Sequence, residues 1–350
     1  MPLKDFNAYN FRCLKRIALE ADPNYNLIYG ANASGKTSIL EAIAYLGRGK
    51  SFRGAAPRQL YRHGSTEFRL RGTVQTETRP VAVSVRNGKQ GLEVKIDGDV
   101  ETSAAALAEV LPLQVLDPEV HNLVAGSPEH RRRYLDWLAF HVEQGYAARW
   151  RRFRRALKQR NAALRVAGDS ASLTAWDREL DQTRQRTLDK AQAALQETAG
   201  TLLDCVVRFE YRSGWAPGRS LEDTLAENRE KDRLSGTTLA GPQRAELALM
   251  FDQRQAKRLV SRGQQKLLAC AMILAATEVV QTSLGRALTL LLDDPAAELD
   301  RSAIDRLLGR VFGLGCQIIA TALEAGTLRF PQPPAMFHVE QGELRTGAVL

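Results

Sequence analysis

Cysteine is scarce in this sequence, and the few cysteines stand far apart. Cys13, Cys205, Cys270 and Cys316 form no C-x-x-C pair in 350 residues. Zinc sites and disulfide frameworks need closely spaced or paired cysteines, so this spacing argues against both and suits a reducing compartment. The chain also has no uninterrupted apolar stretch of membrane-spanning length, and its first residues lack the apolar segment of a signal peptide. We therefore expect a cytoplasmic protein with no membrane partner.

Acidic residues are outnumbered by basic ones. The chain has 49 Lys and Arg against 40 Asp and Glu, which gives a formal net charge of +9. The excess is concentrated at Arg131–Arg133 and between Arg149 and Arg160. A basic balance of this kind indicates an anionic partner, and nucleic acid is favoured over a membrane surface. A hydrophobic content of 44% is ordinary for a soluble globular protein.

The second basic segment is the candidate DNA-contacting surface. In a helix, Arg151, Arg154 and Lys158 share one face, and that face lies off an apolar stripe. Such a strip could bind duplex phosphates without reading bases, and the alternative is a solvated helix surface with no partner. The candidate DNA-binding residues are the basic side chains beside the apolar stripe: Arg151, Arg152, Arg154, Arg155 and Lys158.

One short segment near the N-terminus has the spacing of a phosphate-binding loop. A predicted strand, Asn26–Tyr29, leads into a G-x-x-x-x-G-K-T run, and a predicted helix follows from Lys36 to Leu46. Glycines let the backbone turn tightly and approach a ligand, and the helix directs its positive end at an anion. The candidate nucleotide-binding residues are those of the run itself: Gly30, Ala31, Asn32, Ala33, Ser34, Gly35, Lys36 and Thr37.

Two side chains of this loop carry chemistry that a turn alone does not need. Lys36 would reach the β- and γ-phosphates of a nucleotide such as ATP, and the Thr37 hydroxyl would ligate Mg²⁺. The alternative is a chance match to the pattern in an ordinary turn. The strand before the loop and the helix after it favour nucleotide binding.

The chain divides into three predicted zones. Residues 1–117 contain the loop and then segments of alternating polarity at 67–74, 80–90 and 91–97, which predict an antiparallel meander with a turn at Asn87-Gly88. Residues 118–212 are predicted to be helical, and residues 213–350 return to α/β character. The fold class expected is α/β.

The helical zone is expected to form a short antiparallel hairpin. Its first helix has Ser127 as N-cap, Pro128 at the first helical position and an acid in the first turn, and its apolar spacing continues to Leu157. The second helix is expected to begin near Ser172, with Leu173 as its first apolar residue. Its remaining apolar positions recur at helical spacing: Trp176, Leu180, Leu188, Leu195 and Leu202.

A second candidate element of the nucleotide site lies at residues 287–300. The run Leu288–Leu292 is apolar apart from Thr289, as expected of a central parallel strand, and Asp293 and Asp294 follow it. Ligands bind at this edge of open α/β sheets. One of these two carboxylates can hold Mg²⁺ through its water shell, and the adjacent one can orient and polarise the attacking water. The catalytic candidates are therefore Lys36, Asp293 and Asp294. The alternative is a strand that ends in a turn.

A third motif, SRGQQK at 261–266, precedes a strongly apolar helix. A helix N-terminus suits an anion, so Ser261 and Gly263 could form a second phosphate site, one that completes the pocket of a partner molecule. A plain N-cap followed by a turn explains the same residues.

The three motifs resemble, in order, those of ABC-type ATPases of the SMC and Rad50 group, and the details are most similar to the RecF family. Further segments that carry this resemblance are NFR at 10–12, LEAIAYLGRGKSFR at 40–53, DPEVHNLVAGSPEHRRRYLD at 117–136, GPQR at 241–244 and FHVEQGEL at 337–344. The resemblance covers nearly the whole chain, and a short hairpin stands where SMC relatives have long coiled coils.

The resemblance implies an ABC-type P-loop ATPase head, built from a mixed sheet with flanking helices and an antiparallel meander, with an inserted helical lobe. It implies an N-terminal half of the head at 1–117, a helical arm at 118–212 and a C-terminal half at 213–350. It also implies that Asp293, with Thr37, holds Mg²⁺ and that Asp294 stands where many relatives have a catalytic Glu. Ser261, Gly263 and Gln264 would contact the γ-phosphate of ATP held by a second subunit, and Glu298 to Asp300 would cross the dimer interface.

The function implied is an ATP-dependent DNA-binding protein of recombinational gap repair, replication restart and SOS induction. ATP would close a homodimer on DNA gaps or single-strand/duplex junctions without sequence preference, and slow, DNA-stimulated hydrolysis would release it. RecR and RecO are the partner proteins implied.

The sequence departs from the family pattern at several positions. Ala33 stands where Gly is usual and must avoid a positive φ or bear its cost. Ala297 replaces a usual Ser, and Gln243 replaces a common His. The ABC switch His has no His counterpart, Thr321 being the nearest candidate, and Gln114 lies in a predicted strand, which leaves the Q-loop residue open. These departures favour slow ATP turnover.

Two other functions share some of these motifs. An ATPase subunit of a membrane transporter has all three motifs and predicts a membrane protein partner. A phosphoryl-transfer enzyme such as a kinase uses only the phosphate loop and leaves 261–266 without a role.

Overall fold

The computed structural model describes residues 2–101, 103–166, 174–203, 205–251, 254–255 and 260–345. They form two compact units, the first made of Met1–Val120 with Gly285–Leu350 and the second of His121–Leu284. The chain therefore divides after residues 120 and 284, whereas we expected boundaries after 117 and 212. Residues 213–284 belong with the helical unit because β10 (Glu246–Phe251) pairs with β9 (Arg208–Arg212) and α9 (Arg262–Leu284) packs against α6 (Thr174–Leu203).

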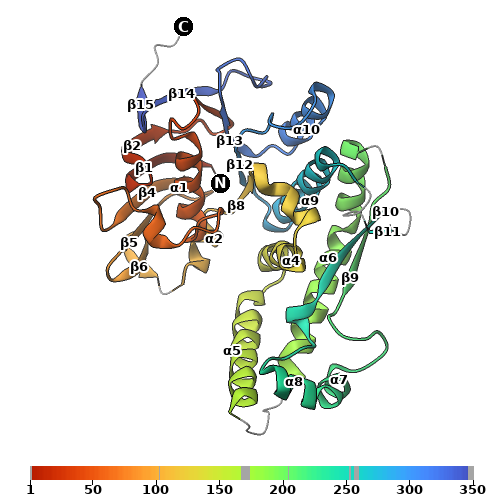
Figure 1. Ribbon diagram of the computed structural model, residues 1–350. Helices are drawn as coiled ribbons and strands as arrows, with labels where there is room; N and C mark the ends of the chain where they lie inside the picture. The colour runs from red at the N-terminus through yellow and green to blue at the C-terminus, as the bar shows by residue number, and fades with distance from the viewer. Residues whose placement is uncertain are drawn as a thin grey trace. The chain divides into compact units, whose positions relative to one another are not determined.

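Unit 1 contains two sheets (Figure 1). A mixed six-stranded sheet has the order β15-β14-β3-β13-β12-β8, in which β14, β3, β13, β12 and β8 are parallel and β15 alone is antiparallel to its neighbour. Its strands are β3 (Tyr25–Tyr29), β8 (Leu113–Leu116), β12 (Thr289–Leu292), β13 (Gln317–Ala322), β14 (Ala335–Glu340) and β15 (Glu343–Arg345).

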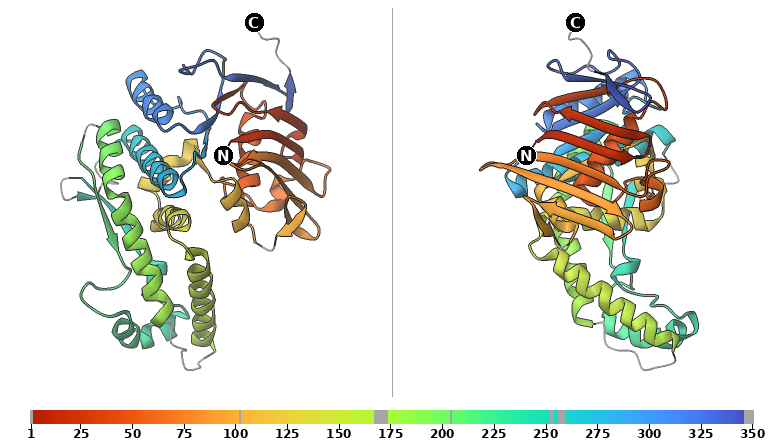
Figure 2. Two further views of the ribbon diagram at one scale, coloured as in Figure 1. Left: turned by 180° about the vertical axis from the view of Figure 1, so that it is seen from behind. Right: turned by 90° about the vertical axis from the view of Figure 1, so that its left-hand side faces the viewer.

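The second sheet of unit 1 is antiparallel throughout, in the order β2-β1-β4-β5-β6-β7, and Figure 2 shows it face-on. The predicted meander is present, but its predicted turn at Asn87-Gly88 is wrong. Asn87 lies within a strand, buried, and its side chain accepts a hydrogen bond from the Tyr61 hydroxyl, so the chain turns two residues later. The strands are β1 (Leu3–Phe11), β2 (Leu14–Glu20), β4 (Phe68–Gln75), β5 (Pro80–Gly88), β6 (Gly91–Ile96) and β7 (Asp99–Glu101).

The core of unit 1 lies around the helix that follows the phosphate loop, α1 (Lys36–Arg48). Apolar side chains of α1 join those of both sheets in one buried cluster, which includes Phe6, Ile43, Phe68 and Ile319. This packing fixes the start of α1 beside the carboxyl ends of β3 and β12. The remaining helices of unit 1 are α2 (Ala105–Val110) and α10 (Arg301–Gly313), with 3₁₀ turns at Pro57–Leu60 and, across the unit boundary, Pro118–His121.

Unit 2 is mainly helical, and α5 and α6 lie side by side in it (Figures 1 and 2). A three-stranded sheet, β11-β10-β9, completes the unit. Leu180, Leu188, Leu195 and Leu202 of α6 are buried, as their spacing predicts. The helices not yet given are α3 (Asn122–Ala125), α4 (Pro128–Val142), α5 (Tyr146–Arg165), α7 (Leu221–Glu227) and α8 (Arg229–Ser235), and β11 is Arg254–Gln255.

The first predicted helix of this unit is in fact two. Ser127 is the N-cap and Pro128 the first helical residue, as predicted, but α4 ends at Val142 and α5 begins at Tyr146. Gly145 between them has a φ of 75°, a left-handed conformation that apolar periodicity does not reveal. The predicted start of the second helix, Ser172 and Leu173, lies outside the described residues, as does the side chain of Trp176.

Helix α9 is long and apolar enough to cross a membrane by length and composition, although no such segment is predicted above. Of its most apolar stretch, 61% is buried within the protein. Tyr134 of α4 donates a hydrogen bond from its hydroxyl to the Met272 carbonyl of α9, over 3.0 Å. A buried core helix passes the same test of length and composition, so this is weak evidence for a membrane span.

Candidate nucleotide site and basic helix surface

The phosphate loop connects β3 to α1 within unit 1. The strand ends at Tyr29 and the helix begins at Lys36, both within a residue of the prediction. Gly30 and Gly35 have φ angles of 153° and 115°, which a residue with a side chain rarely adopts. Ala33 has a φ of 60°, so it does not avoid the left-handed region and instead bears its cost.

Lys36 extends back over the loop. Its Nζ donates hydrogen bonds to the carbonyl oxygens of Gly30, at 2.6 Å, and Ala31, at 2.9 Å. Burial lowers the pKa of Lys36, while the nearby carboxylates of Asp294 and Asp293 oppose that shift. The ammonium group is thus already held inside the loop, at the place where phosphate oxygens would bind.

A hydrogen-bonded chain of side chains joins the loop to the neighbouring strands. The Thr37 hydroxyl donates to Asp293 Oδ1 at 2.9 Å, and the Thr321 hydroxyl donates to the same oxygen at 2.9 Å. Thr321 Oγ1 also accepts a hydrogen bond from the Asp294 backbone N–H at 2.9 Å. Thr321 is fully buried in β13, so its hydroxyl fixes both aspartates within the fold.

The two aspartates differ in environment. Asp293 is buried at the end of β12, and burial raises its pKa, as does nearby Asp294, while the hydrogen bonds from Thr37 and Thr321 lower it. Asp294 is partly exposed, with a φ of 46° that turns the chain away from the strand. One carboxylate is therefore fixed in the sheet edge and the other lies at its surface.

A third carboxylate at this edge was not among the predicted site residues. Asp117 follows β8, the strand parallel to β12, and the Asp293 N–H donates to the Leu116 carbonyl at 2.8 Å. Burial and the charge of Asp293 raise the pKa of Asp117 to about 6, and the charge of Arg48 opposes the shift. The signal in the sequence is the predicted strand around Gln114, which an aspartate follows directly.

Gln114, considered for the Q-loop, lies inside β8 and is buried. Its side-chain oxygen accepts a hydrogen bond from Arg48 Nη2 at 2.9 Å. Gln114 therefore anchors the end of α1 and does not face the loop that follows the strand.

The donor set suits a nucleotide with Mg²⁺ more than a metal held by protein alone. Among the described residues, no three His, Cys, Asp or Glu side chains are grouped to hold a metal ion. Mg²⁺ is usually held by one or two protein oxygens with water and phosphate, which Thr37 and Asp293 can supply. The Ser34 hydroxyl is buried within the phosphate loop and has no hydrogen-bond partner among the described residues, so it can donate to an anion in the loop.

The motif at 261–266 lies at the N-terminus of α9, in unit 2. The Ser261 hydroxyl accepts a hydrogen bond from the Gln264 N–H at 3.3 Å, and the Gln264 side chain accepts one from the Ser261 N–H at 2.9 Å. This reciprocal pair is a capping box. The simpler interpretation, an N-cap, therefore accounts for these side chains in the single chain, and Gly263 lies in the first turn. A role toward a second subunit's ATP stays a prediction.

The segment predicted to cross a dimer interface follows Asp294. Glu298 is exposed with a φ of 66°, and the Asp300 carboxylate caps α10 by accepting a hydrogen bond from the Ala303 N–H at 2.9 Å. The cap gives Asp300 a role in the single chain. Ala297, where the family usually has Ser, lies in the same turn.

The predicted DNA-contacting residues all lie on the exposed side of α5, opposite the buried Phe153. The Arg154 guanidinium lies over the Trp150 ring, 5.0 Å from its centroid. Four of the five form no ion pair with any described residue: Arg151, Arg154, Arg155 and Lys158.

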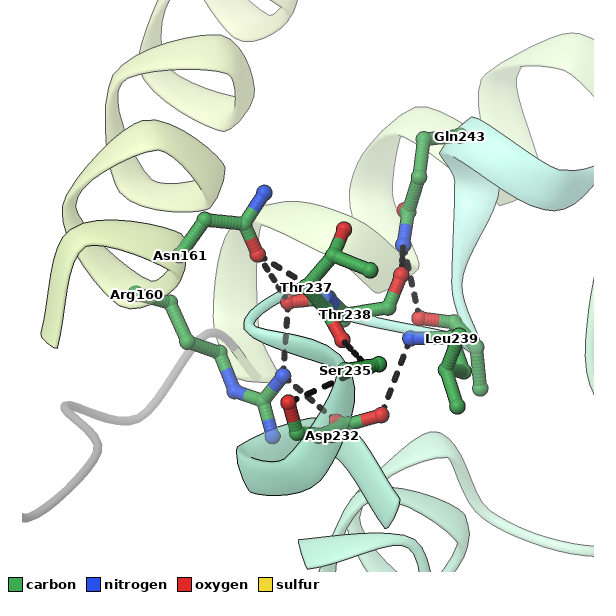
Figure 3. Close-up of polar contacts among 9 residues, drawn as sticks. Arg160, Asn161, Asp232, Ser235, Thr237, Thr238, Leu239 and Gln243 are labelled. Atoms are coloured by element: carbon green, nitrogen blue, oxygen red, sulfur yellow. Dashed lines mark hydrogen bonds and ion pairs between the residues drawn. The ribbon is translucent and has the colours of Figure 1, made fainter. Parts of the chain in front are cut away.

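The basic residues at the two ends of the segment are already paired with carboxylates of the protein. Arg149 pairs with Glu179 at 2.5 Å, and Arg160 pairs with Asp232 at 2.7 Å and donates to Thr238 Oγ1 at 2.6 Å. Figure 3 shows Arg160 inside a network that joins α5 to α8 and to the loop before Gln243. Arg149 and Arg160 are therefore excluded from the predicted DNA-contacting strip, which keeps only the exposed basic residues between them.

Gln243, which stands where His is common, has a role in this loop. Its Nε2 donates to the carbonyls of Ala240, at 2.9 Å, and Thr238, at 3.3 Å (Figure 3). The amide thus holds the segment that receives Arg160.

Comparison with known proteins gives a consistent family. Residues 2–344 match the family model described as RecF/RecN/SMC N terminal domain. The DNA replication and repair protein RecF of Chromohalobacter salexigens is 38% identical over 99% of this chain and 100% of its own length. The protein of the same name from a Pseudomonas fluorescens strain is 37% identical, over 98% of each chain.

Solved structures share the fold. A structure of the recombination mediator protein RecF-ATP in the RecFOR pathway superposes with a TM-score of 0.87 at 24% identity, covering 99% of this chain and 98% of its own. An Smc head bound to the C-winged helix domain of ScpA gives 0.62 at 16% identity, covering 99% and 96%. The predicted fold class, an α/β ABC-type ATPase head, is confirmed. On the identity of its curated relatives over nearly its full length, this chain belongs to the RecF family.

Proposed function

We propose that this protein is an ATP-dependent DNA-binding protein of recombinational gap repair, which also serves replication restart and SOS induction. The observation that carries the proposal is the 2.9 Å hydrogen bond from Thr37 to Asp293. It joins the phosphate loop to the acidic strand end, as an ATP site with Mg²⁺ requires. The names of the curated relatives support the assignment to DNA replication and repair.

ATP binding is assigned to Gly30–Thr37. Backbone N–H groups of the loop and the N-terminus of α1 would receive the phosphates, and Lys36 would exchange its carbonyl partners for phosphate oxygens. Thr37 and Asp293 would hold Mg²⁺, which neutralises phosphate charge when bound. Asp294, at the exposed edge, would orient and polarise the water that attacks the γ-phosphorus.

The switch is a homodimer. Ser261, Gly263 and Gln264 of one copy would contact the γ-phosphate of ATP held by the other, with Glu298 to Asp300 at the interface. ATP then stabilises the dimer and ADP does not, because ADP lacks the group that the second copy recognises. Hydrolysis is expected to be slow and to be stimulated by DNA.

DNA is assigned to the exposed face of α5 in unit 2. Its basic side chains would neutralise phosphates of gaps or single-strand/duplex junctions, without sequence preference. Binding of this kind would mark the site for loading a recombinase, with RecR and RecO as partner proteins in the cytoplasm. A transporter ATPase or a kinase is not favoured, because the relatives that span the whole chain are RecF proteins.

Sedimentation tests the proposal. The wild type, Lys36→Ala and Ser261→Arg are compared with ATP, ADP or no nucleotide, each with and without duplex DNA. Dimers are expected only for the wild type with ATP, at lower protein concentration when DNA is present. A monomer that ignores nucleotide, or dimers that persist in both variants, contradicts the switch.

A further inference from the structure

The C-terminal hairpin β14–β15 contacts the phosphate loop, although its sequence, which contains FHVEQGEL, has no role in the proposed chemistry. Strand β14 pairs in parallel with β3, the strand that ends at the loop. A Cβ built on Gly30 would lie 2.2 Å from the Val339 carbonyl oxygen of β14. The loop and the hairpin therefore meet backbone to backbone.

The turn of this hairpin makes a second contact. Gln341 and Gly342 have φ angles of 50° and 78° and join Glu340 to Glu343, so they form a two-residue turn of the primed type. The Gly342 N–H donates a hydrogen bond to the Ser34 carbonyl at 2.8 Å. A Cβ on Gly342 would lie 2.7 Å from the Cys13 carbonyl oxygen, so the turn fits closely between two segments.

The bond to Ser34 has a consequence for the next amide. The Ser34 carbonyl and the Gly35 N–H belong to one planar trans peptide, in which they point in opposite directions. A donor that holds the carbonyl on one side therefore aims the Gly35 N–H to the other. The Gly35 N–H is among the amides that a phosphate-binding loop presents to its ligand.

The loop needs such support because its own conformation is unfavourable. Ala33 is held at a φ of 60°, and Gly35 at 115°. Left-handed backbone at a residue with a side chain costs roughly 1–2 kcal/mol, so contacts outside the loop must stabilise it.

We propose that the hairpin β14–β15 braces the phosphate loop, and that Gly342 is a positioning residue that orients the Ser34–Gly35 peptide for ATP. This inference rests on the proposed ATP site. Gly342 does not contact the nucleotide, and its effect passes through the Ser34 carbonyl.

The test compares Gly342→Asn with Gly98→Asn. Asp97 and Gly98, with φ angles of 52° and 93°, form the same kind of two-residue turn between β6 and β7, and nothing lies within 4 Å of a Cβ at Gly98. Asn tolerates positive φ, so both variants carry a similar backbone cost. Only Gly342→Asn places a Cβ against Cys13 and displaces the turn from Ser34.

ATP affinity, measured by calorimetry, is expected to fall about tenfold in Gly342→Asn, the size of one well-placed hydrogen bond, and to stay at the wild-type value in Gly98→Asn. Without nucleotide, amide hydrogen exchange in residues 30–38 is expected to be faster in Gly342→Asn alone. Urea unfolding reports the stability of both variants.

Equal ATP affinity and equal exchange in the two variants would overturn the brace. A loss of affinity that follows the loss of stability in both variants would also overturn it, because a general weakening of the fold would then explain the effect. If the wild type itself does not bind ATP, the proposed function fails, and the exchange comparison in the free protein still decides whether the hairpin braces the loop.

Discussion

Charged side chains are held by hydrogen bonds in the nucleotide site of unit 1 but are exposed to solvent on the α5 surface of unit 2. At the site, Lys36 and Asp293 are held by hydrogen bonds before any ligand arrives. On α5, Arg151, Arg155 and Lys158 are exposed and form no ion pair with the described residues. A preorganised site recognises one ligand in one geometry, whereas a row of solvated charges binds any polyanion and depends on salt.

Within unit 2 the same contrast separates the two helices of the hairpin. Helix α5 has eight basic residues and no acidic one. On α6, Arg178 pairs with Glu222, and Arg186 and Lys190 pair with Glu143. Both helices are amphipathic, so packing does not explain why four basic side chains of α5 form no ion pair with the described residues whereas these three of α6 do.

The largest effect is expected where one group of the preorganised site is removed. Asp293→Asn keeps the shape and an oxygen that can accept from Thr37 and Thr321, but it removes the negative charge that would hold Mg²⁺. ATP hydrolysis is expected to fall at least about 100-fold, as when a metal ligand is lost. Steady-state hydrolysis over a range of Mg²⁺ concentrations measures it.

Nucleotide binding in the absence of Mg²⁺ is the control for this variant, because the hydroxyl hydrogen bonds remain. It should stay near the wild-type value. Unchanged hydrolysis in Asp293→Asn would show that the site does not depend on this carboxylate.

A smaller and more distributed effect is expected on α5. Replacing Arg151, Arg154, Arg155 and Lys158 with Ala removes four charges, each of which would release about 0.9 counterions on contact with a phosphate. The slope of log affinity against log salt should therefore become shallower by roughly 3 to 4, with affinity lower by roughly 30- to 100-fold at low salt. Fluorescence anisotropy with gapped DNA measures both.

The matched control lies on the other helix. Replacing Arg178, Arg186 and Lys190 of α6 with Ala removes side chains that are 61%, 51% and 54% exposed but already paired with carboxylates. This variant should bind DNA nearly as the wild type does. The control removes three charges and the α5 variant four, so equal losses per charge removed would mean that net charge, and not the α5 surface, determines binding.

The sequence predicted those features that depend on local spacing. It predicted β3, the start of α1, the buried strand β12 and the exposure of the five basic residues on α5. It missed features that depend on backbone conformation or on distant contacts. Gly145 separates two helices whose apolar positions continue in phase, and the turn after Gly88 is displaced because Tyr61, 26 residues away in sequence, binds Asn87.

The candidate site shows the same limit. The loop and Asp293 could be found from motifs, but the partner that fixes Asp293, Thr321, comes from a strand whose place in the sheet no local pattern gives. Asp117 was missed because its role follows from β8 lying beside β12. Division of the chain into units failed at residues 213–284 for a related reason, since the pairing of β10 with β9 is a tertiary contact.

Asp117 allows a test of how much the grouped carboxylates at the ends of β8 and β12 lower the free energy of unfolding. Its pKa, raised to about 6 from 3.8, means that the folded protein keeps this proton over a pH range in which the unfolded chain has lost it. Stability is therefore lost as pH rises from about 4 to 6, and the full cost, about 3 kcal/mol, is present at pH 7. Asp117→Asn should raise the free energy of unfolding by up to about 3 kcal/mol at pH 7, and by nothing below pH 4.

Urea unfolding in EDTA, at several pH values, measures this difference without interference from metal. Asp99→Asn, at an exposed strand end of the same unit, is the control for the loss of one carboxylate charge. A destabilising effect of Asp117→Asn at pH 7 would contradict the assignment, because it would mean that the carboxylate stabilises the fold through Arg48.

The smallest effect expected concerns the strain of the phosphate loop, which has no counterpart on α5. Ala33 has a φ of 60°, whereas Ala31, in the same loop, has none of this strain. Ala33→Gly relieves the left-handed conformation but adds freedom to the unfolded chain, so a net gain of about 0.5–1 kcal/mol in unfolding free energy is expected. Ala31→Gly adds only the freedom and should destabilise by about 0.5–1 kcal/mol. Urea unfolding of the two variants should therefore give opposite signs, and the same sign for both would show that the loop is not strained at Ala33. The left-handed conformation of Ala33 is stabilised by contacts such as the hydrogen bond from Gly342 to Ser34. These contacts remain in Ala33→Gly, so its ATP affinity should change little.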